Sequence, residues 1–177
     1  MAIIKLNNQS ISSVTALPAG VVDANALASG VGGKVVQVVQ ARTISGIGVS
    51  SSTEVTTTIT AQITPTSASN KILIIASVNG VQMGGSAGTG ATFNLRRHDT
   101  STSATSGTIL ATLVPYGGFD NTSSDNQYAL SANHYDTPST TDARNYTITT
   151  YRANGSGSYT VQNNGASSGI ALMEIAV

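Results

Sequence analysis

Few residues in this chain form a pattern that could carry out catalysis. Gly84-Gly-Ser-Ala-Gly88 matches the G-x-S-x-G pattern that presents a nucleophilic serine, here Ser86, in one class of hydrolases. That pattern must lead into a helix and needs a histidine base with an acidic partner, whereas Thr89-Gly90 and a strand-like segment follow here. We therefore interpret the match as accidental, and we expect no catalytic residue and no enzyme activity.

Metal binding has an equally weak pattern. His98 and His134 each lie within two residues of an aspartate, Asp99 and Asp136, and these four side chains would hold a metal ion if their strands met. No short spacing between the histidines fixes such a site, so we favour the alternative in which both lie at strand ends and face solvent or one another's loops. The loop Asp120–Asp125 offers oxygen ligands but lacks the alternation of a calcium loop. We expect neither a metal nor a cofactor.

Arg96 and Arg97 are the strongest local cationic feature. Consecutive residues of a strand point to opposite faces, so one arginine can support the fold while the other reaches a carboxylate of a neighbouring chain. We treat both as candidate contacts between subunits. The alternative is an ordinary pair of solvated side chains.

Charged residues are scarce, at 9% of the chain against a usual share of about 25%. The 8 basic and 8 acidic residues balance, so no broad field attracts nucleic acid or an anionic membrane. The longest apolar runs are far shorter than the roughly 20 residues that span a bilayer. A net charge near zero removes long-range repulsion between copies. We expect a homo-oligomer, with a trimer as first choice, and no nucleic-acid or membrane partner.

From Lys34 onward, short segments rich in Val, Ile, Thr and Tyr alternate with clusters of Gly, Ser, Asn and Asp, as in strands joined by turns. In residues 71–79 both faces are apolar, which predicts a strand at the centre of a sheet. The last segment places Ala171, Met173, Ile175 and Val177 on one face. The predicted strands are residues 34–42, 53–64, 71–79, 91–98, 107–114, 127–135, 144–153 and 169–177. They predict an all-β fold, an eight-stranded antiparallel sandwich of the jelly-roll type.

Residues 1–33 differ in texture and are expected to form an extended N-terminal arm beside a β-sandwich domain of residues 34–177. Asp23 and Gly30 are suited to begin and end a short helix within this arm. The arm cannot bury its few apolar residues alone, so we expect it to attach to the sandwich or to a neighbouring molecule. The residues expected to make this attachment are Ile3, Ile4, Leu6, Ile11, Val14 and Leu17.

Four stretches of the chain carry a family resemblance: residues 4–20, 33–40, 63–74 and 172–177. They look like the corresponding parts of virion structural proteins from marine and freshwater tailed phages, cyanophages in particular. The loops between them show no such likeness. The resemblance implies a location on the virion, where proteins of this group are head decorations or tail-fibre components, and it brings no catalytic residues with it.

These observations predict a capsid decoration, or cement, protein on the head exterior. Its partners would be the major capsid protein or other virion proteins, and it would assemble in the cytoplasm of the bacterial host. The alternative is a tail-fibre or receptor-binding component that recognises the host surface through loops 80–90, 99–107 and 117–126.

Overall fold

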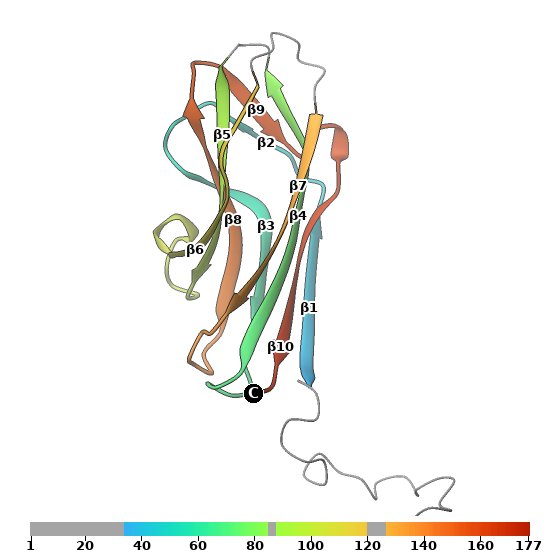
Figure 1. Ribbon diagram of the computed structural model, residues 1–177, viewed down its shortest axis with the longest axis vertical. Helices are drawn as coiled ribbons and strands as arrows, with labels where there is room; N and C mark the ends of the chain where they lie inside the picture. The colour runs from blue at the N-terminus through green and yellow to red at the C-terminus, as the bar shows by residue number, and fades with distance from the viewer. Residues whose placement is uncertain (1–33, 85–87, 120–126) are drawn as a thin grey trace, which may run out of the picture. The chain divides into compact units, whose positions relative to one another are not determined.

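The computed structural model describes residues 34–84, 88–119 and 127–177, which form two antiparallel sheets packed as a sandwich (Figure 1). Sheet A contains β1 (Val35–Thr43), β2 (Ile47–Val49), β4 (Lys71–Gly84), β7 (Gln127–Asp136), β9 (Ser158–Val161) and β10 (Ser168–Ile175). Sheet B contains β3 (Val55–Ile63), β5 (Thr89–His98), β6 (Thr108–Phe119) and β8 (Arg144–Asn154). Two short 3-10 helices, η1 (Ala104–Ser106) and η2 (Asn163–Gly165), lie in the connections. The predicted arm and its short helix lie outside the described residues.

The strand order is that of a jelly roll. Sheet B runs β3-β8-β5-β6. In sheet A, β4 lies between β10 and β7, since Ile74 is opposite both Leu172 and His134, and β1 pairs with the other side of β10. The orders β1-β10-β4-β7 and β3-β8-β5-β6 are those of two interlocked Greek keys. The predicted fold class and the central place of the strand that begins at Lys71 are therefore confirmed.

Two strands extend this arrangement beyond the sequence-based prediction. β9 pairs with the second half of β4, where Met83 lies opposite Tyr159, and β2 pairs with β9, where Val49 lies opposite the same tyrosine. β9 thus lies on the same side of β4 as β10, beyond the end of β10. In the same way, β2 lies beyond the end of β1. Each predicted segment overlaps one observed strand, several of which extend beyond the predicted ends, and β2 and β9 are the additions.

The core lies between the two sheets and follows from the alternation of side chains along each strand. β3, β4 and β10 bury every second residue, and the rings of Phe93 and Tyr159 meet at 6.2 Å between centroids. The largest fully buried apolar side chains are Ile59, Ile63, Ile72, Ile74, Phe93, Leu95, Tyr146, Ile148, Tyr159, Ile170 and Leu172. Within the described ranges, no helix has the length and apolar character needed to cross a membrane.

Glu174 is a charged residue within this buried layer, with 0% of its surface exposed. Its Oε1 accepts hydrogen bonds from the Thr66 backbone N–H (2.7 Å), the Thr66 hydroxyl (2.9 Å) and Asn70 Nδ2 (2.6 Å). Its Oε2 accepts one from Gln37 Nε2 at 2.6 Å. The carboxylate therefore ties β10 to β1 and to the turn between β3 and β4.

Candidate assembly surface

The outer face of sheet A, which points away from sheet B, carries apolar side chains in neighbouring rows. In one row, Val38 of β1 lies opposite Met173 of β10, which lies opposite Leu73 of β4. Leu73 is in turn opposite Tyr135 of β7. The rows on either side add Ala171 opposite Ile75, and Val35 opposite Ile175. We call this set the apolar outer face: Val35, Val38, Leu73, Ile75, Tyr135, Ala171, Met173 and Ile175.

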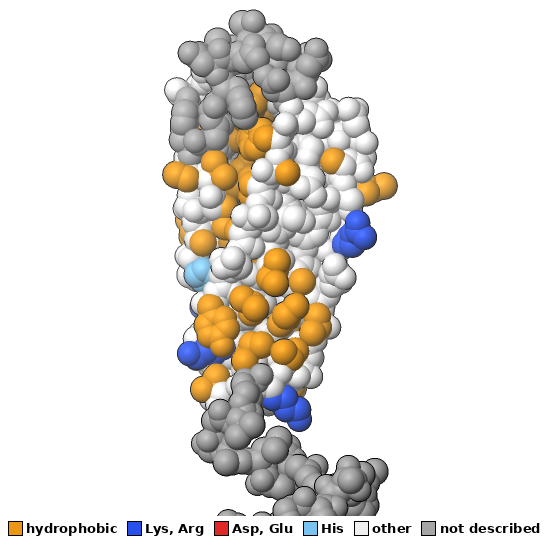
Figure 2. All heavy atoms as spheres, turned by 45° about the vertical axis from the view of Figure 1, so that its right-hand side comes forward, with side chains coloured by type: hydrophobic (Ala, Val, Ile, Leu, Met, Phe, Trp, Pro, Cys, Tyr) orange, Lys and Arg blue, Asp and Glu red, His pale blue; other side chains and the backbone are white. Residues whose placement is uncertain are grey.

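Several of these side chains are exposed to an extent unusual for large apolar residues. The exposed fraction is 56% for Val38, 50% for Tyr135 and 44% for Ile75. Figure 2 shows the apolar side chains gathered on one face, with Lys and Arg at the border and no Asp or Glu in view. The Lys71 ammonium lies 5.4 Å from the centre of the Tyr135 ring, a distance at which the cation is attracted to the aromatic face.

This face has a clear boundary along the strands. In the row beyond Ala171 and Ile75, Gly169 lies opposite Ser77, and Ser77 lies opposite Ser131. The small residues there leave a hollow of about 380 Å³, which Ile75 lines on the apolar side and Arg42 and Asn79 line on the other. The apolar outer face therefore occupies one end of sheet A and gives way to a polar surface at the other.

Such a face favours association with another protein surface. An antiparallel sheet that covers a core on one side usually carries polar residues on the other, so that the other side can face water. Contiguous exposed apolar patches on soluble proteins commonly mark interaction sites. Each Å² of apolar surface removed from water contributes about 25 cal/mol, which favours covering this face with another protein surface.

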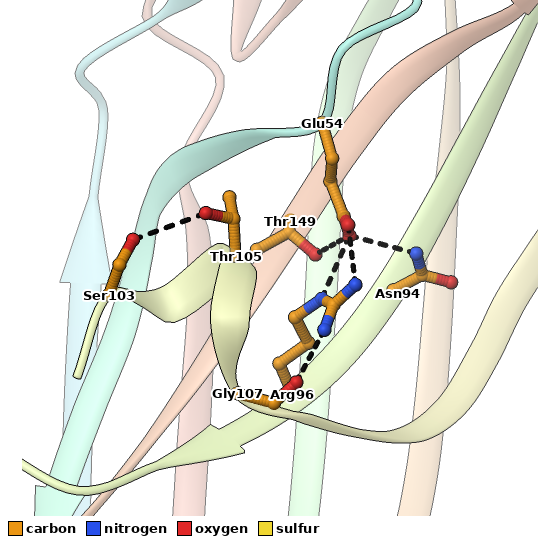
Figure 3. Close-up of polar contacts among 7 residues, drawn as sticks. All are labelled: Glu54, Asn94, Arg96, Ser103, Thr105, Gly107 and Thr149. Carbon is orange, nitrogen blue, oxygen red and sulfur yellow. Dashed lines mark hydrogen bonds and ion pairs between the residues drawn. The ribbon is translucent and has the colours of Figure 1, made fainter.

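Arg96 lies on the outer side of sheet B in a nearly buried polar cluster (Figure 3). Its Nε and Nη2 donate to the two carboxylate oxygens of Glu54 at 3.0 and 2.5 Å, and its Nη1 donates to the Gly107 carbonyl. Asn94 and Thr149 also donate to Glu54. Burial alone raises the pKa of Glu54, but the hydrogen bonds from Arg96, Asn94 and Thr149 outweigh it and hold this pKa below its usual range.

Arg97 points to the opposite side and joins the two sheets. Its Nη1 donates to both carboxylate oxygens of Asp136 on β7, at 2.8 and 2.9 Å, and the Tyr146 hydroxyl donates to the same carboxylate at 2.7 Å. Burial, followed by this hydrogen bond, raises the pKa of Tyr146. Both arginines therefore have a carboxylate partner within the chain. These bonds within the chain do not require a contact with a neighbouring subunit, and that contact stays a prediction.

The two histidines belong to different sheets. His98 ends β5, where its Nδ1 lies 2.9 Å from the carbonyl oxygens of Asp99 and Thr102 and its Nε2 lies 3.1 Å from the Thr147 hydroxyl. His134 is on β7, opposite Ile74. Across the described residues, no three His, Cys, Asp or Glu side chains are grouped so that they could hold a metal ion. The Asp120–Asp125 loop and Ser86 lie outside these residues.

The residues expected to attach the arm also lie outside the described part of the chain. They are Ile3, Ile4, Leu6, Ile11, Val14 and Leu17. The apolar outer face was not predicted from the sequence as an interaction site, although its signal was present. In residues 71–78 both faces of the strand are apolar, which was interpreted only as a central position in a sheet, and the last segment was seen to carry apolar residues on one face. In two antiparallel neighbours, that pattern also indicates a second apolar surface.

Comparisons with known proteins give matches in structure alone. No protein-family model and no curated protein match the sequence. The chain is similar to a chain in the structure of infectious bursal disease virus Gx strain, with 16% identity and a TM-score of 0.42 over 80% of this chain and 37% of that one. The infectious bursal disease virus VP2 subviral particle gives 14% identity and a TM-score of 0.39, covering 81% and 38%. This chain thus spans well under half the length of those viral chains.

Proposed function

We propose that this protein is a non-enzymatic structural protein of a bacteriophage virion that works by binding other protein surfaces. The observation that carries the proposal is the apolar outer face, where Val38, Ile75 and Tyr135 are each about half exposed on a folded, hydrogen-bonded sheet. The low charge of the chain, 9%, supports close packing against other proteins. The resemblance of residues 4–20, 33–40, 63–74 and 172–177 to phage virion proteins supports the location.

The specific role that we propose is a capsid decoration, or cement, protein on the head exterior. The apolar outer face and the apolar residues of the arm, Ile3 to Leu17, would be buried against the major capsid protein or other virion proteins. Repetition of the contact over the linked copies of one oligomer turns a modest gain per copy into firm attachment. We propose that the protein is a homo-oligomer, a trimer in the sequence-based expectation, and that it assembles in the host cytoplasm.

A substitution within the apolar outer face tests directly whether this face attaches the protein to particles. We expect Ile75→Lys to reduce occupancy on particles at least about tenfold, because a charge is placed at the centre of the contact. Ile109→Lys is the matched control, since Ile109 on β6 is 47% exposed against 44% for Ile75. Quantitative mass spectrometry of purified particles measures both. Equal occupancy of the two variants would contradict the role of this face.

Deletion of residues 2–20 tests the arm separately. We expect this deletion to abolish attachment to particles while the melting temperature of the sandwich stays unchanged. Particle occupancy and a circular dichroism melt of the same variant give the two results. Wild-type occupancy of the deleted protein would show that the arm has no part in attachment.

A second candidate function, a tail-fibre or receptor-binding component, is favoured by one feature of the structure. A polar hollow of about 290 Å³ lies beside the segment 99–107, and Arg97, His98, Thr102 and Arg144 help to line it. Its donors and hydroxyl groups suit a hydrogen-bonding ligand such as a host glycan. Copy number distinguishes the two functions, because a cement protein covers the head in many copies whereas a fibre tip is present in few.

A further inference from the structure

The free edge of β1 is the second surface that stands out. On one side, β1 pairs with β10 in an unbroken register from Gln37 to Thr43. On the other side it has no strand partner among the described residues, since it forms the border of sheet A (Figure 1). A strand edge of this kind presents a row of backbone N–H and C=O groups to any strand that approaches it.

Proteins normally protect such edges, and three other border strands of this sandwich, β3, β6 and β7, show how. β6 contains Pro115 and pairs with β5 through several register irregularities. β3 is irregular between Thr56 and Thr60 and alternates threonines along its exposed side. β7 carries mainly Ser, Asn and Gln on its exposed side. Each has a proline, an irregularity or polar side chains that weaken pairing with another chain.

β1 has little of this protection. The stretch 35–41 reads Val-Val-Gln-Val-Val-Gln-Ala, without proline, glycine or charge, and its one irregularity lies at the start, between Val35 and Gln37. Val35 and Val38 are 47% and 56% exposed. A β-branched, uncharged segment of this length on a free edge readily pairs with a further strand.

We infer that two copies of this chain pair through the free edges of β1, antiparallel, so that their sheets A join into one continuous sheet. A second copy fits because the edge is self-complementary. The valines and glutamines of β1 in one copy would lie beside the same residue types of β1 in the other. The antiparallel arrangement also places the charged Arg42 of each copy at opposite ends of the pair. The inference does not depend on the virion role, because it follows from the strand edge alone.

This contact has two consequences for the assembly. It obeys a two-fold axis and therefore requires an even number of chains: two alone, or six if the expected trimer also forms. It also brings two apolar outer faces side by side, because β1 borders each of them. The joined sheet would offer a partner one apolar surface of about twice the size.

Disulfide cross-linking tests the pairing, since the chain has no cysteine of its own. We would introduce Val36→Cys, Val38→Cys and Gln40→Cys one at a time and oxidise each full-length protein, alone and in pairwise mixtures. Residues directly opposite in antiparallel strands have Cα atoms about 4.5–5.5 Å apart, within the range of a disulfide. We expect one of these combinations to give a covalent dimer in high yield. Thr58→Cys on β3 and Ile109→Cys on β6 are the controls and should stay unlinked.

Mass measurement by analytical ultracentrifugation gives an independent result. We expect the wild-type mass to be an even multiple of one chain and Val38→Lys to halve it, while Ile109→Lys leaves it unchanged. A wild-type monomer or trimer, or linking no stronger at β1 than at the controls, would overturn the inference. Because Ile75→Lys tests particle attachment without altering β1, the two proposals can fail separately.

Discussion

Single residues in this protein matter most where a charge is buried. Glu174 and Glu54 are both held by several donors, and in each case the hydrogen bonds offset the cost of removing a carboxylate from water. The sequence shows that Glu174 shares a face with Ile170 and Leu172, because alternate residues of a strand point the same way. It does not show the donors Gln37, Thr66 and Asn70, which other parts of the chain bring to the carboxylate.

Glu174→Gln tests this arrangement. The amide NH₂ of glutamine would face donors such as Gln37 Nε2, so one buried group loses its partner, at a cost of about 1–3 kcal/mol. We expect the free energy of unfolding, measured in urea, to fall by that amount. Asp142→Asn is the control, because the Asp142 side chain is 79% exposed, and should change stability by less than about 0.5 kcal/mol. Equal effects of the two changes would contradict a supporting role for Glu174.

The same carboxylate predicts how stability depends on pH. Burial alone raises the pKa of Glu174, but hydrogen bonds from Asn70, Gln37 and Thr66 outweigh it and lower this pKa from its ordinary value of 4.5 to about 2. Because the pKa is lower in the folded state, the stabilisation is complete above pH 4.5 and is lost as pH falls from 4.5 towards 2. Urea midpoints of the wild type should fall over this range, and those of Glu174→Gln should fall less. If the urea midpoints of the wild type and of Glu174→Gln fell in parallel with pH, Glu174 would not be the source of this pH dependence.

At the scale of elements, the strands were predictable where period-two patterns run long enough to be seen. β3 and β10 have clear alternation over many residues, whereas β2 and β9 have only 3 and 4 residues, too few for alternation to be distinguished from chance. The predicted end of β4 at residue 79 was too early. Gly80, with φ of 63°, lets the strand continue through a register shift between Val78 and Val81 to its second set of partners.

Gly80→Ala should therefore be strongly destabilising. A Cβ at this position would lie 2.5 Å from the Ala166 Cβ and 2.9 Å from two backbone atoms of Asn163, and the positive φ adds strain. We expect a loss of roughly 2 kcal/mol or more in the free energy of unfolding. Gly48→Ala on β2 is the matched control, because its added Cβ would meet nothing within 4 Å, and it should cost less than about 1 kcal/mol. A Gly80 variant as stable as the control would show that the backbone there can adapt.

At the scale of the whole molecule, alternation reveals which residues share a face but not which faces the fold leaves open. Ala171, Met173 and Ile175 were correctly grouped from the sequence, yet their exposure follows from the neighbours that the jelly roll places beside them. Arg96 and Arg97 were correctly placed on opposite sides. Their partners, Glu54 and Asp136, are distant in sequence, so local pattern could not identify them.

The open apolar face predicts binding of a fluorescent apolar dye by the native protein. We expect Ile75→Lys to reduce the dye signal at least about twofold, because it breaks the continuity of the patch, and Ile109→Lys to leave it near the wild-type value. Titration at neutral pH, with folding checked by circular dichroism, measures this. A native protein that binds no dye would indicate that the face is already covered in solution.

The ladder between β1 and β10 also determines how the sandwich bears mechanical load. A pull transmitted through residue 33 enters at the start of β1, where the Lys34 carbonyl accepts a hydrogen bond from the Ala176 N–H and the paired register runs on to Thr43. When that pull is directed along the strand, it shears the ladder, so that its bonds share the tension instead of opening one after another. A tether attached there would therefore resist sudden stress far better than the energy of any one of its hydrogen bonds suggests.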